Sequence, residues 1–401
     1  MNVVVTLEHR FHRTPDGAVW SEAAFGYRFW QQYLTVFDEV HIFARSSPMA
    51  SVPSDWQRVD GKAVSLMALP YYLGPQQYVL HARHIQLMGK AVVESSSALI
   101  MRVPSPIANS FSPQLYRSKR PYGLQIVGDP HDVFSPGGVR HILRPLFRWW
   151  LARQLRTQCH RACATNYVTQ HALQRRYPPA PDAHSTTFSD VELHDEAFVT
   201  APRAYEQAGP EFRLVMVGSL MQLYKAPDVL LDALEICIHQ YGLQLALSMV
   251  GDGQYRPALE RQSERLGLSE RVSFLGQLRF GEAVRHQLDQ ADIFVLPSRT
   301  EGLPRAMIEA MARGLPCIGS TVGGIPELLP AEAMVPPGDA RALAEKIRDV
   351  VCDPARMRRM ASRNLATALN YHEDVLSRHR HDFYMAVYEC TQAWLQKRAS
   401  K

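Results

Sequence analysis

The sequence lacks long apolar runs and has few cysteines. None of its hydrophobic stretches approaches the roughly 20 residues needed to cross a bilayer, so no membrane-spanning helix is expected. The amino terminus has no basic region, and Met1–Glu8 therefore indicates a first buried strand rather than a signal peptide. The six cysteines of this 401-residue chain show no regular spacing, which favours reduced thiols and a cytoplasmic setting.

Two signatures of cofactor and metal chemistry are also absent. No Gly-x-Gly-x-x-Gly motif follows a predicted strand, which argues against a nicotinamide dehydrogenase. No Asp-x-Asp triplet occurs, so a metal ion bridging a diphosphate to the protein is not supported. We therefore expect neither a cofactor nor a metal site.

Acidic residues are scarce between residues 101 and 180. This window holds eleven arginines and one lysine against Asp129 and Asp132 alone, a net charge of +10. Because the whole chain carries +5, the remainder carries −5. A basic face of this kind favours an anionic partner, and we rank a phosphorylated lipid or membrane surface before nucleic acid, since no nucleic-acid-binding signature is present.

Short apolar segments alternate with longer amphipathic ones, which predicts parallel sheets in an α/β architecture. Residues 193–210 break this pattern with proline, glycine and scattered charge, and are predicted to be a linker. We therefore expect a Rossmann-like domain over residues 1–195, a second over 211–370, and a helix over 371–401 that packs back on the first. Ligands bind in such folds at the carboxyl ends of the strands, here in a cleft between the sheets.

The predicted elements are these. Strands are expected at 2–7, 40–44, 98–101, 123–127, 165–168, 213–217, 245–250, 272–275, 293–296 and 316–320. Helices are expected at 21–36, 77–95, 143–158, 226–241, 257–266, 282–290 and 303–313.

Two carboxylates eight residues apart, Glu301 and Glu309, follow the apolar strand 293–296. Pro304 suits the first turn of a helix, where its missing N–H costs nothing. Glu301 is thus expected in a loop at the strand's carboxyl end and Glu309 inside the helix, near backbone N–H groups that attract anions. This arrangement suits a polyol, a phosphate and a second polyol, the outline of a nucleotide sugar. The alternative is a pair of solvated carboxylates.

Two further strand ends carry glycine. Gly218-Ser-Leu-Met-Gln-Leu-Tyr-Lys225 follows strand 213–217, and Lys225 is placed to neutralise a departing diphosphate across the cleft. A solvated lysine at a helix start is the alternative. Thr321-Val-Gly-Gly-Ile-Pro-Glu327 follows strand 316–320, where paired glycines permit close approach to a ligand or simply a turn.

Taken in order, these segments resemble the second domain of the family 4 retaining glycosyltransferases of the GT-B fold. The resemblance runs from Leu214 to about Ile347. It rests on Gly218-Ser-Leu with Lys225, Val250-Gly-Asp-Gly253, Val272-Ser-Phe-Leu-Gly276, Ala291–Ser298, the Glu301/Glu309 pair and Gly323-Gly-Ile-Pro-Glu327. It implies two Rossmann-like domains facing a central cleft, with a C-terminal helix crossing back to the first.

The resemblance also implies roles for matching residues. Glu301 would bind hydroxyls of the donor sugar, Glu309 the ribose hydroxyls, and Lys225 the diphosphate. Many relatives have Gly-Arg-Leu where this chain has Ser219 in the middle, so either Ser219 acts more weakly or an arginine such as Arg305 compensates. The implied donor-binding set is Gly218, Ser219, Lys225, Gly251, Val272, Glu301, Gly302, Leu303 and Glu309, with the amides of Gly302 and Leu303 facing sugar and diphosphate.

The first half of the chain matches less well. The segment from Glu8 to Gly17 stands where the family has a glycine-rich first loop, with Gly17 as its single glycine. Val127-Gly-Asp-Pro-His-Asp132 resembles the segment that carries a cleft His or Asp. We therefore assign Gly17, Asp129 and His131 to the acceptor side and count His131, with Lys225 and Glu301, as catalytic. A turn with a satisfied histidine is the alternative.

Arg140, Arg144 and Arg148 recur every four residues beside apolar residues that include Trp149 and Trp150. On a helix this gives a basic stripe next to an apolar one, as in helices that lie in a membrane interface. The stripe suits docking at an anionic membrane. A core-facing helix with a solvated basic side is the alternative.

We therefore predict a metal-independent retaining glycosyltransferase that moves a hexose from a nucleoside-diphosphate sugar to a glycan or lipid-linked acceptor, in cell-surface polysaccharide or glycolipid synthesis. It would be cytoplasmic and peripheral at the inner face of the membrane, with no nucleic-acid partner. Front-side attack comes from the family picture, since no covalent nucleophile can be assigned. A sugar-nucleotide epimerase or hydrolase of the same fold, and a non-catalytic nucleotide-sugar-binding subunit, remain alternatives.

Overall fold

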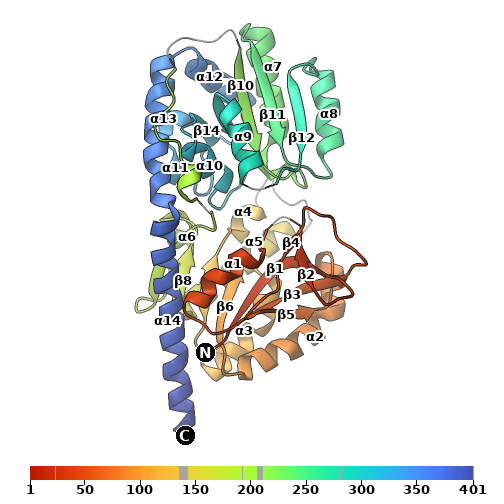
Figure 1. Cartoon of the computed structure of the whole chain (residues 1–401), viewed down its shortest axis with the longest axis vertical. Coiled ribbons are helices and arrows are strands. Elements are labelled where there is room, and N and C mark those ends of the chain that lie inside the picture. The colour runs from red at the N-terminus through yellow and green to blue at the C-terminus, as the bar shows by residue number, and fades with distance from the viewer. Residues whose placement is uncertain (23, 135–142, 192, 206–210, 280, 401) are drawn as a thin grey trace.

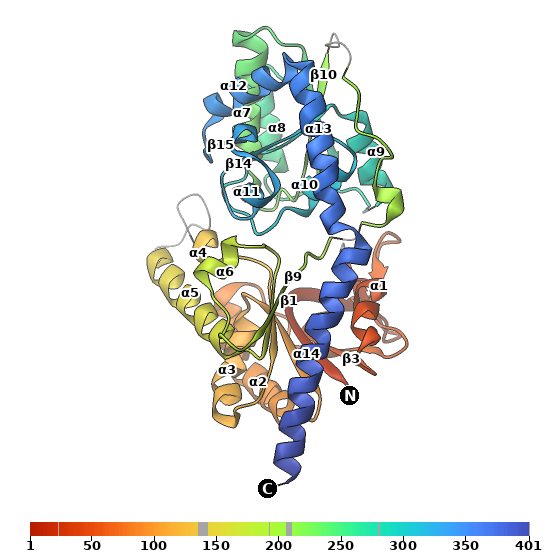
Figure 2. The ribbon, with the colours of Figure 1, turned by 90° about the vertical axis from the view of Figure 1, so that its left-hand side faces the viewer.

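The computed structural model describes residues 1–22, 24–134, 143–191, 193–205, 211–279 and 281–400. These ranges form two largely parallel sheets, each covered by helices and stacked along the long axis of the molecule (Figure 1). The last two helices run along one side of both (Figure 2). The α/β class with two Rossmann-like halves is confirmed.

The first sheet has nine strands. Its parallel part has the order β5-β3-β1-β6-β7-β8-β9, and β2 and β4 form an antiparallel extension on β1. The strands are β1 Val3–Arg13, β2 Val19–Ser21, β3 Val40–Pro48, β4 Gln57–Arg58, β5 Val64–Leu69, β6 Ala98–Val103, β7 Gly123–Ile126, β8 Ala164–Tyr167 and β9 His184–Thr187. The helices are α1 Tyr27–Gln31, α2 Gly74–Glu94, α3 Pro106–Ser118, α4 Pro130–Val133, α5 Arg144–Arg161 and α6 Ala172–Arg176.

The buried centre of this sheet explains its parallel pairing. Every residue of β6 and β7 is buried, as expected for strands that helices cover on both faces. Alternate residues supply the two faces: Val5 packs on the side of α1 and α14, and Val4 on the side of α2 and α3. The expected helix over 21–36 begins only at Tyr27, because β2 takes up Val19–Ser21.

The second sheet has six parallel strands in the order β12-β11-β10-β13-β14-β15. The strands are β10 Phe212–Val217, β11 Leu245–Val250, β12 Val272–Gly276, β13 Ile293–Leu296, β14 Cys317–Ser320 and β15 Met334–Val335. The helices are α7 Pro227–Glu235, α8 Arg256–Arg265, α9 Glu282–Gln290, α10 Arg305–Ala312, α11 Ile325–Leu328, α12 Ala340–Val351 and α13 Pro354–Ala368, with a short 3₁₀ turn η3 at Leu223–Lys225. We call the first sheet with α1–α6 the N-terminal domain and the second with α7–α13 the C-terminal domain.

The last helix, α14 Glu373–Ala399, packs against β6 to β9 of the N-terminal domain. Tyr384 stacks on Tyr33 with ring centroids 4.6 Å apart, which adds to the apolar burial at this contact. Gly123 leaves room for the helix, because a Cβ there would lie 2.5 Å from Val387 Cγ2. The helix thus crosses back as expected.

No helix among the described residues is long and apolar enough to cross a membrane. All six cysteines are free thiols, and Cys159, Cys237 and Cys317 are buried.

Candidate active site

Glu301 and Lys225 form an ion pair at the carboxyl edge of the second sheet. Glu301 follows β13 in a loop, as expected, and its Oε1 lies 2.6 Å from Lys225 Nζ. Ser298 Oγ donates to the same oxygen at 2.8 Å. The side chain of Glu301 is only 7% exposed and that of Lys225 only 13%. Burial is the largest single influence and lowers the pKa of Lys225, but the charge of Glu301, the nearby Tyr224 and the hydrogen bond to Glu301 together raise this pKa above its usual value, so Lys225 stays cationic.

Two glycines hold this lysine in place. A Cβ on Gly218 would lie 2.3 Å from Lys225 Cδ, so the glycine makes room for the lysine side chain. Gly251 has φ +135° and packs so closely that its own Cβ would lie 2.0 Å from Gly218 O. Ser219 Oγ accepts a bond from Met221 N at 3.2 Å and so serves the turn that follows β10. The structure therefore places Gly218, Ser219 and Gly251 next to Lys225 at the end of β10.

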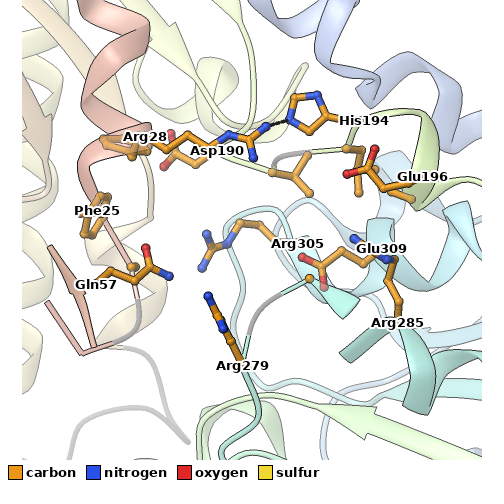
Figure 3. Close-up of a pocket in the computed structure, with 17 residues that line it drawn as sticks. Phe25, Arg28, Gln57, Asp190, His194, Glu196, Arg279, Arg285, Arg305 and Glu309 are labelled. Atoms are coloured by element: carbon orange, nitrogen blue, oxygen red, sulfur yellow. Dashed lines mark hydrogen bonds between the residues drawn. The ribbon is translucent and has the colours of Figure 1, made fainter. Parts of the chain in front are cut away.

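Glu309 lies one turn into α10 and faces a pocket of about 500 Å³ between the two domains. Arg305 is the first residue of the same helix, and Figure 3 shows its side chain pointing into the pocket beside Glu309. Burial raises the pKa of Glu309, and Arg305 and then Arg285 partly offset this effect. Of the described residues, Lys225, Glu301 and His131 are outside the lining of this pocket.

The N-terminal domain supplies pocket residues that the sequence analysis missed. Phe25 and Gln57 face Arg305 and Arg279 across the pocket (Figure 3). Phe25 has φ +63°, a conformation that a bulky residue adopts only when its surroundings hold it there. Such residues carry no motif, and no sequence signal places them opposite α10.

A buried ion pair supports this wall of the pocket. Asp190 lines the pocket and pairs with Arg102, which is 5% exposed. Burial raises the pKa of Asp190, but the charge and hydrogen bond of Arg102, with the charges of Arg305 and Arg380, together bring this pKa below its usual value. The guanidinium of Arg102 also lies 5.3 Å from the centre of the Phe25 ring, so the pair helps to fix Phe25.

The segment Val127–Asp132 forms a tightly bonded loop and the short helix α4. Asp129 caps α4 by accepting from His131 N at 2.8 Å, and it also accepts from Tyr177 Oη at 2.5 Å. Asp129, His131 and Asp132 lie close enough together to hold a metal ion. However, Arg176 Nη1 bonds both Asp129 and Asp132, so a guanidinium already supplies the positive charge.

Glycines bring this loop against the donor-side loops. A Cβ on Gly302 would lie 2.9 Å from Val127 O of the N-terminal domain. Gly324 N donates to Gly302 O at 2.6 Å, and a Cβ on Gly324 would lie 3.1 Å from Thr169 Cγ2. The loop that carries Glu301 therefore touches the loop that precedes His131. Leu303, the neighbouring residue, is 8% exposed and packs in the core.

Three sequence predictions need correction. Gly17 lies in the tight turn between β1 and β2, because β1 continues to Arg13, and the pocket is lined instead by residues 24–26. Val272 is buried at the amino end of β12, whereas the cleft lies at the carboxyl ends, so it does not reach the donor site. Pro304 is the N-cap of α10 rather than part of its first turn.

The basic stripe also differs from expectation. Arg140 lies outside the described residues. Arg148 turns inward, with its Nη2 3.2 Å from His131 Nδ1, rather than outward to solvent. Arg144 is the first residue of α5 and is half-buried. The exposed face of α5 instead combines apolar residues, with Leu146, Trp149 and Trp150 at 54%, 61% and 43% exposure, and the exposed Arg153, Arg156 and Arg161.

The paired sheets, the intervening pocket and the returning helix define the two-domain GT-B fold. Residues 211–353 match the family model of the glycosyl transferases group 1. The structure resembles that of sucrose-phosphate synthase from Thermosynechococcus elongatus, with a TM-score of 0.69 at 17% identity over 97% of this chain and 99% of that one. It also resembles Anabaena HepE in complex with UDP-glucose, with a TM-score of 0.63 at 17% identity over the full length of both.

Sequence relatives agree with this class. Protein CapJ of Staphylococcus aureus is 22% identical over 80% of both chains. The putative colanic acid biosynthesis glycosyltransferase WcaL of Escherichia coli K12 is 36% identical, over 29% of this chain and 31% of that protein. The C-terminal domain is thus similar to the glycosyl transferases group 1, and the protein is a glycosyltransferase.

Proposed function

We propose that the protein transfers a hexose from a nucleoside-diphosphate sugar to a glycan or lipid-linked acceptor, with retention of configuration. The observation that carries this proposal is the pairing of buried Glu301 with Lys225 at the carboxyl edge of the second sheet, directly before the helix α10 that carries Glu309. A carboxylate can accept bonds from sugar or ribose hydroxyls, and a lysine can neutralise a phosphate. HepE, of the same fold, has been crystallised with UDP-glucose.

The diphosphate would be held without a metal ion. Lys225 and Arg305 supply two cations on the C-terminal domain, and Arg305 stands in for the arginine that relatives carry at the position of Ser219. Both cations would stabilise the charge that develops on the leaving group. His131 would donate a bond to the sugar or the phosphate. No covalent nucleophile is assigned, so we favour front-side attack.

A donor screen tests the proposal. Uridine and guanosine diphosphate sugars are compared in the presence of EDTA. The sugar that serves as donor is expected to raise the melting temperature, because a ligand that binds only the folded state stabilises it by mass action. The Glu309→Gln variant should bind the active donor at least about tenfold more weakly, through loss of charge-assisted bonds. Donor that shifts the melting temperature but is hydrolysed or epimerised without any acceptor would favour the alternative enzymes.

We also propose that the N-terminal domain docks on an anionic membrane. Helices α2, α3 and α5 cover the sheet face opposite α14, and exposed apolar side chains stand on two of them. On α2, Val79, Leu80 and Leu87 are 70%, 80% and 63% exposed, in addition to the exposed tryptophans of α5. Apolar residues on a basic surface are the combination that binds the interface of anionic bilayers.

Flotation with vesicles tests this docking surface. Wild-type protein should float with vesicles containing phosphatidylglycerol and less with pure phosphatidylcholine, and added salt should weaken it. Joint Trp149→Ser and Trp150→Ser substitutions are expected to lower the bound fraction roughly tenfold. Leu369→Ser, at an equally exposed apolar residue of the C-terminal domain (52%), is the control. Equal flotation of all three proteins would refute the surface.

A further inference from the structure

The carboxylate of Glu327 crosses from the C-terminal domain to the N-terminal domain. It ends the Gly323-Gly-Ile-Pro-Glu segment and lies in α11. Its Oε2 accepts from Gln170 N at 2.5 Å, and its Oε1 accepts from His171 N at 2.9 Å and Ala172 N at 2.7 Å. One side chain therefore satisfies three consecutive backbone N–H groups at the start of α6, all on the opposite domain.

Glu327 is rigidly connected to the donor-side loops. Gly323 has φ +54° and approaches so closely that a Cβ there would lie 2.0 Å from Glu301 O. The next residue, Gly324, donates to Gly302 O at 2.6 Å. Glu301, Gly302 and Glu327 consequently move as one unit, although they are distant in sequence.

The same unit meets the N-terminal domain at a second place. Gly302 lies against Val127 O and Gly128, directly before Asp129 and His131. The bonds made by Glu327 and the contact made by Gly302 therefore join the Glu301 loop to two segments of the N-terminal domain, the start of α6 and the segment before His131. The Glu327 bonds are polar and link carboxylate to amide, so water can replace them without the cost of exposing an apolar core.

We infer that Glu327 is a positioning residue for sugar transfer, which holds the two domains closed so that the Glu301 loop faces His131. Domain closure of this kind excludes water and completes the catalytic arrangement. Glu327 itself touches neither substrate nor leaving group in this scheme. The roles of Glu301 and His131 rest on the proposed function, whereas the closure of the domains does not.

Closure is measured first without any substrate, by small-angle X-ray scattering. Glu327→Ala should increase the radius of gyration relative to wild type, and Glu327→Gln, which keeps one acceptor oxygen, should lie between them. Glu345→Ala, at an exposed glutamate of α12, is the control and should match wild type. Equal radii for wild type and Glu327→Ala overturn the inference, even if the donor proves different from the one proposed.

Kinetics with the donor found in the screen give the second readout. Glu327→Ala should lower kcat at least tenfold, with glutamine intermediate, while the dissociation constant of the donor changes less than threefold. This split is expected because the proposed donor contacts, apart from the one made by His131, are on the C-terminal domain. An unchanged kcat, or a donor affinity that falls in step with kcat, contradicts a role in closure. An inactive wild type would reject the proposed function and leave the scattering result to decide the inference.

Discussion

Glu301→Gln is expected to lower kcat for sugar transfer by about 10²–10³-fold, the loss typical when one preorganised electrostatic contact is removed from a transition state. The carboxylate accepts from Lys225 at 2.6 Å and Ser298 at 2.8 Å, so it both fixes the lysine and is itself oriented. An amide keeps the shape but loses the charge-assisted part of these bonds and of the proposed bonds to the sugar. Steady-state transfer rates measure the effect.

Stability must be separated from catalysis in this variant. Loss of the carboxylate leaves the largely buried Lys225 without its counter-charge, which we expect to cost about 3–5 kcal/mol of unfolding free energy. Adding Lys225→Met should restore most of that stability but not the rate. Asp339→Ala is the control. Asp339 is the N-cap of α12, where its Oδ1 accepts from Ala342 N at 2.9 Å, so the substitution should lower the free energy of unfolding by about 1 kcal/mol without changing kcat. Recovery of the rate in the double variant would refute a catalytic role for Glu301.

Much of the C-terminal domain could be predicted because each signal is local. β13 is an uninterrupted apolar run that is buried throughout, and glycines mark the exits of the strands that border the site. Chain order then places Glu301 at the strand end and Glu309 in the helix that follows, because parallel strands all end at the same edge. The prediction for Val272 failed on that same rule, since it is the first residue of its strand and not the last.

The N-terminal wall of the site depends on tertiary packing instead. Phe25 lies in the loop between β2 and α1, and Gln57 lies in the two-residue strand β4, and neither segment shows a clear periodicity. Gly17 was assigned to the site because the segment from Glu8 to Gly17 stands where the family has a glycine-rich first loop, whereas residues 10–13 of this segment continue β1 and pair with β3. Sequence spacing cannot show which side chains meet across a cleft.

Arg148 illustrates how a regular pattern can mislead. Its four-residue spacing from Arg144 predicts that both share one helix face, and both are indeed on α5. Yet Arg148 is near the start of the helix, where α4 packs against α5, and there it lies beside His131. Periodicity predicted the helix but not the helix that packs against it, so the outer surface of α5 carries the exposed tryptophans and later arginines of the helix rather than Arg148.

Gly323→Ala is expected to lower kcat by about 100-fold or more and to cost about 2–4 kcal/mol of unfolding free energy, a loss at the upper end for a single substitution. Part of the cost is the left-handed backbone, at φ +54°, which alanine adopts with a penalty of about 1–2 kcal/mol. The larger part is steric, because the new Cβ would lie 2.0 Å from Glu301 O and 3.1 Å from Gly302 O. Neither contact is with a flexible side chain, so the backbone of the Glu301 loop itself must move.

Gly338→Ala carries only the backbone part of this cost, so its comparison with Gly323→Ala isolates the steric part. Gly338 also has a left-handed backbone, at φ +82°, but nothing lies within 4 Å of the Cβ that it would gain. This control should therefore lose about 1 kcal/mol of stability and keep its kcat. Denaturant unfolding and transfer rates of both variants measure the difference. If the two variants lose stability and rate alike, the close packing of Gly323 on Glu301 is not what holds the carboxylate in place, and the site must be positioned by its ion pair with Lys225 instead.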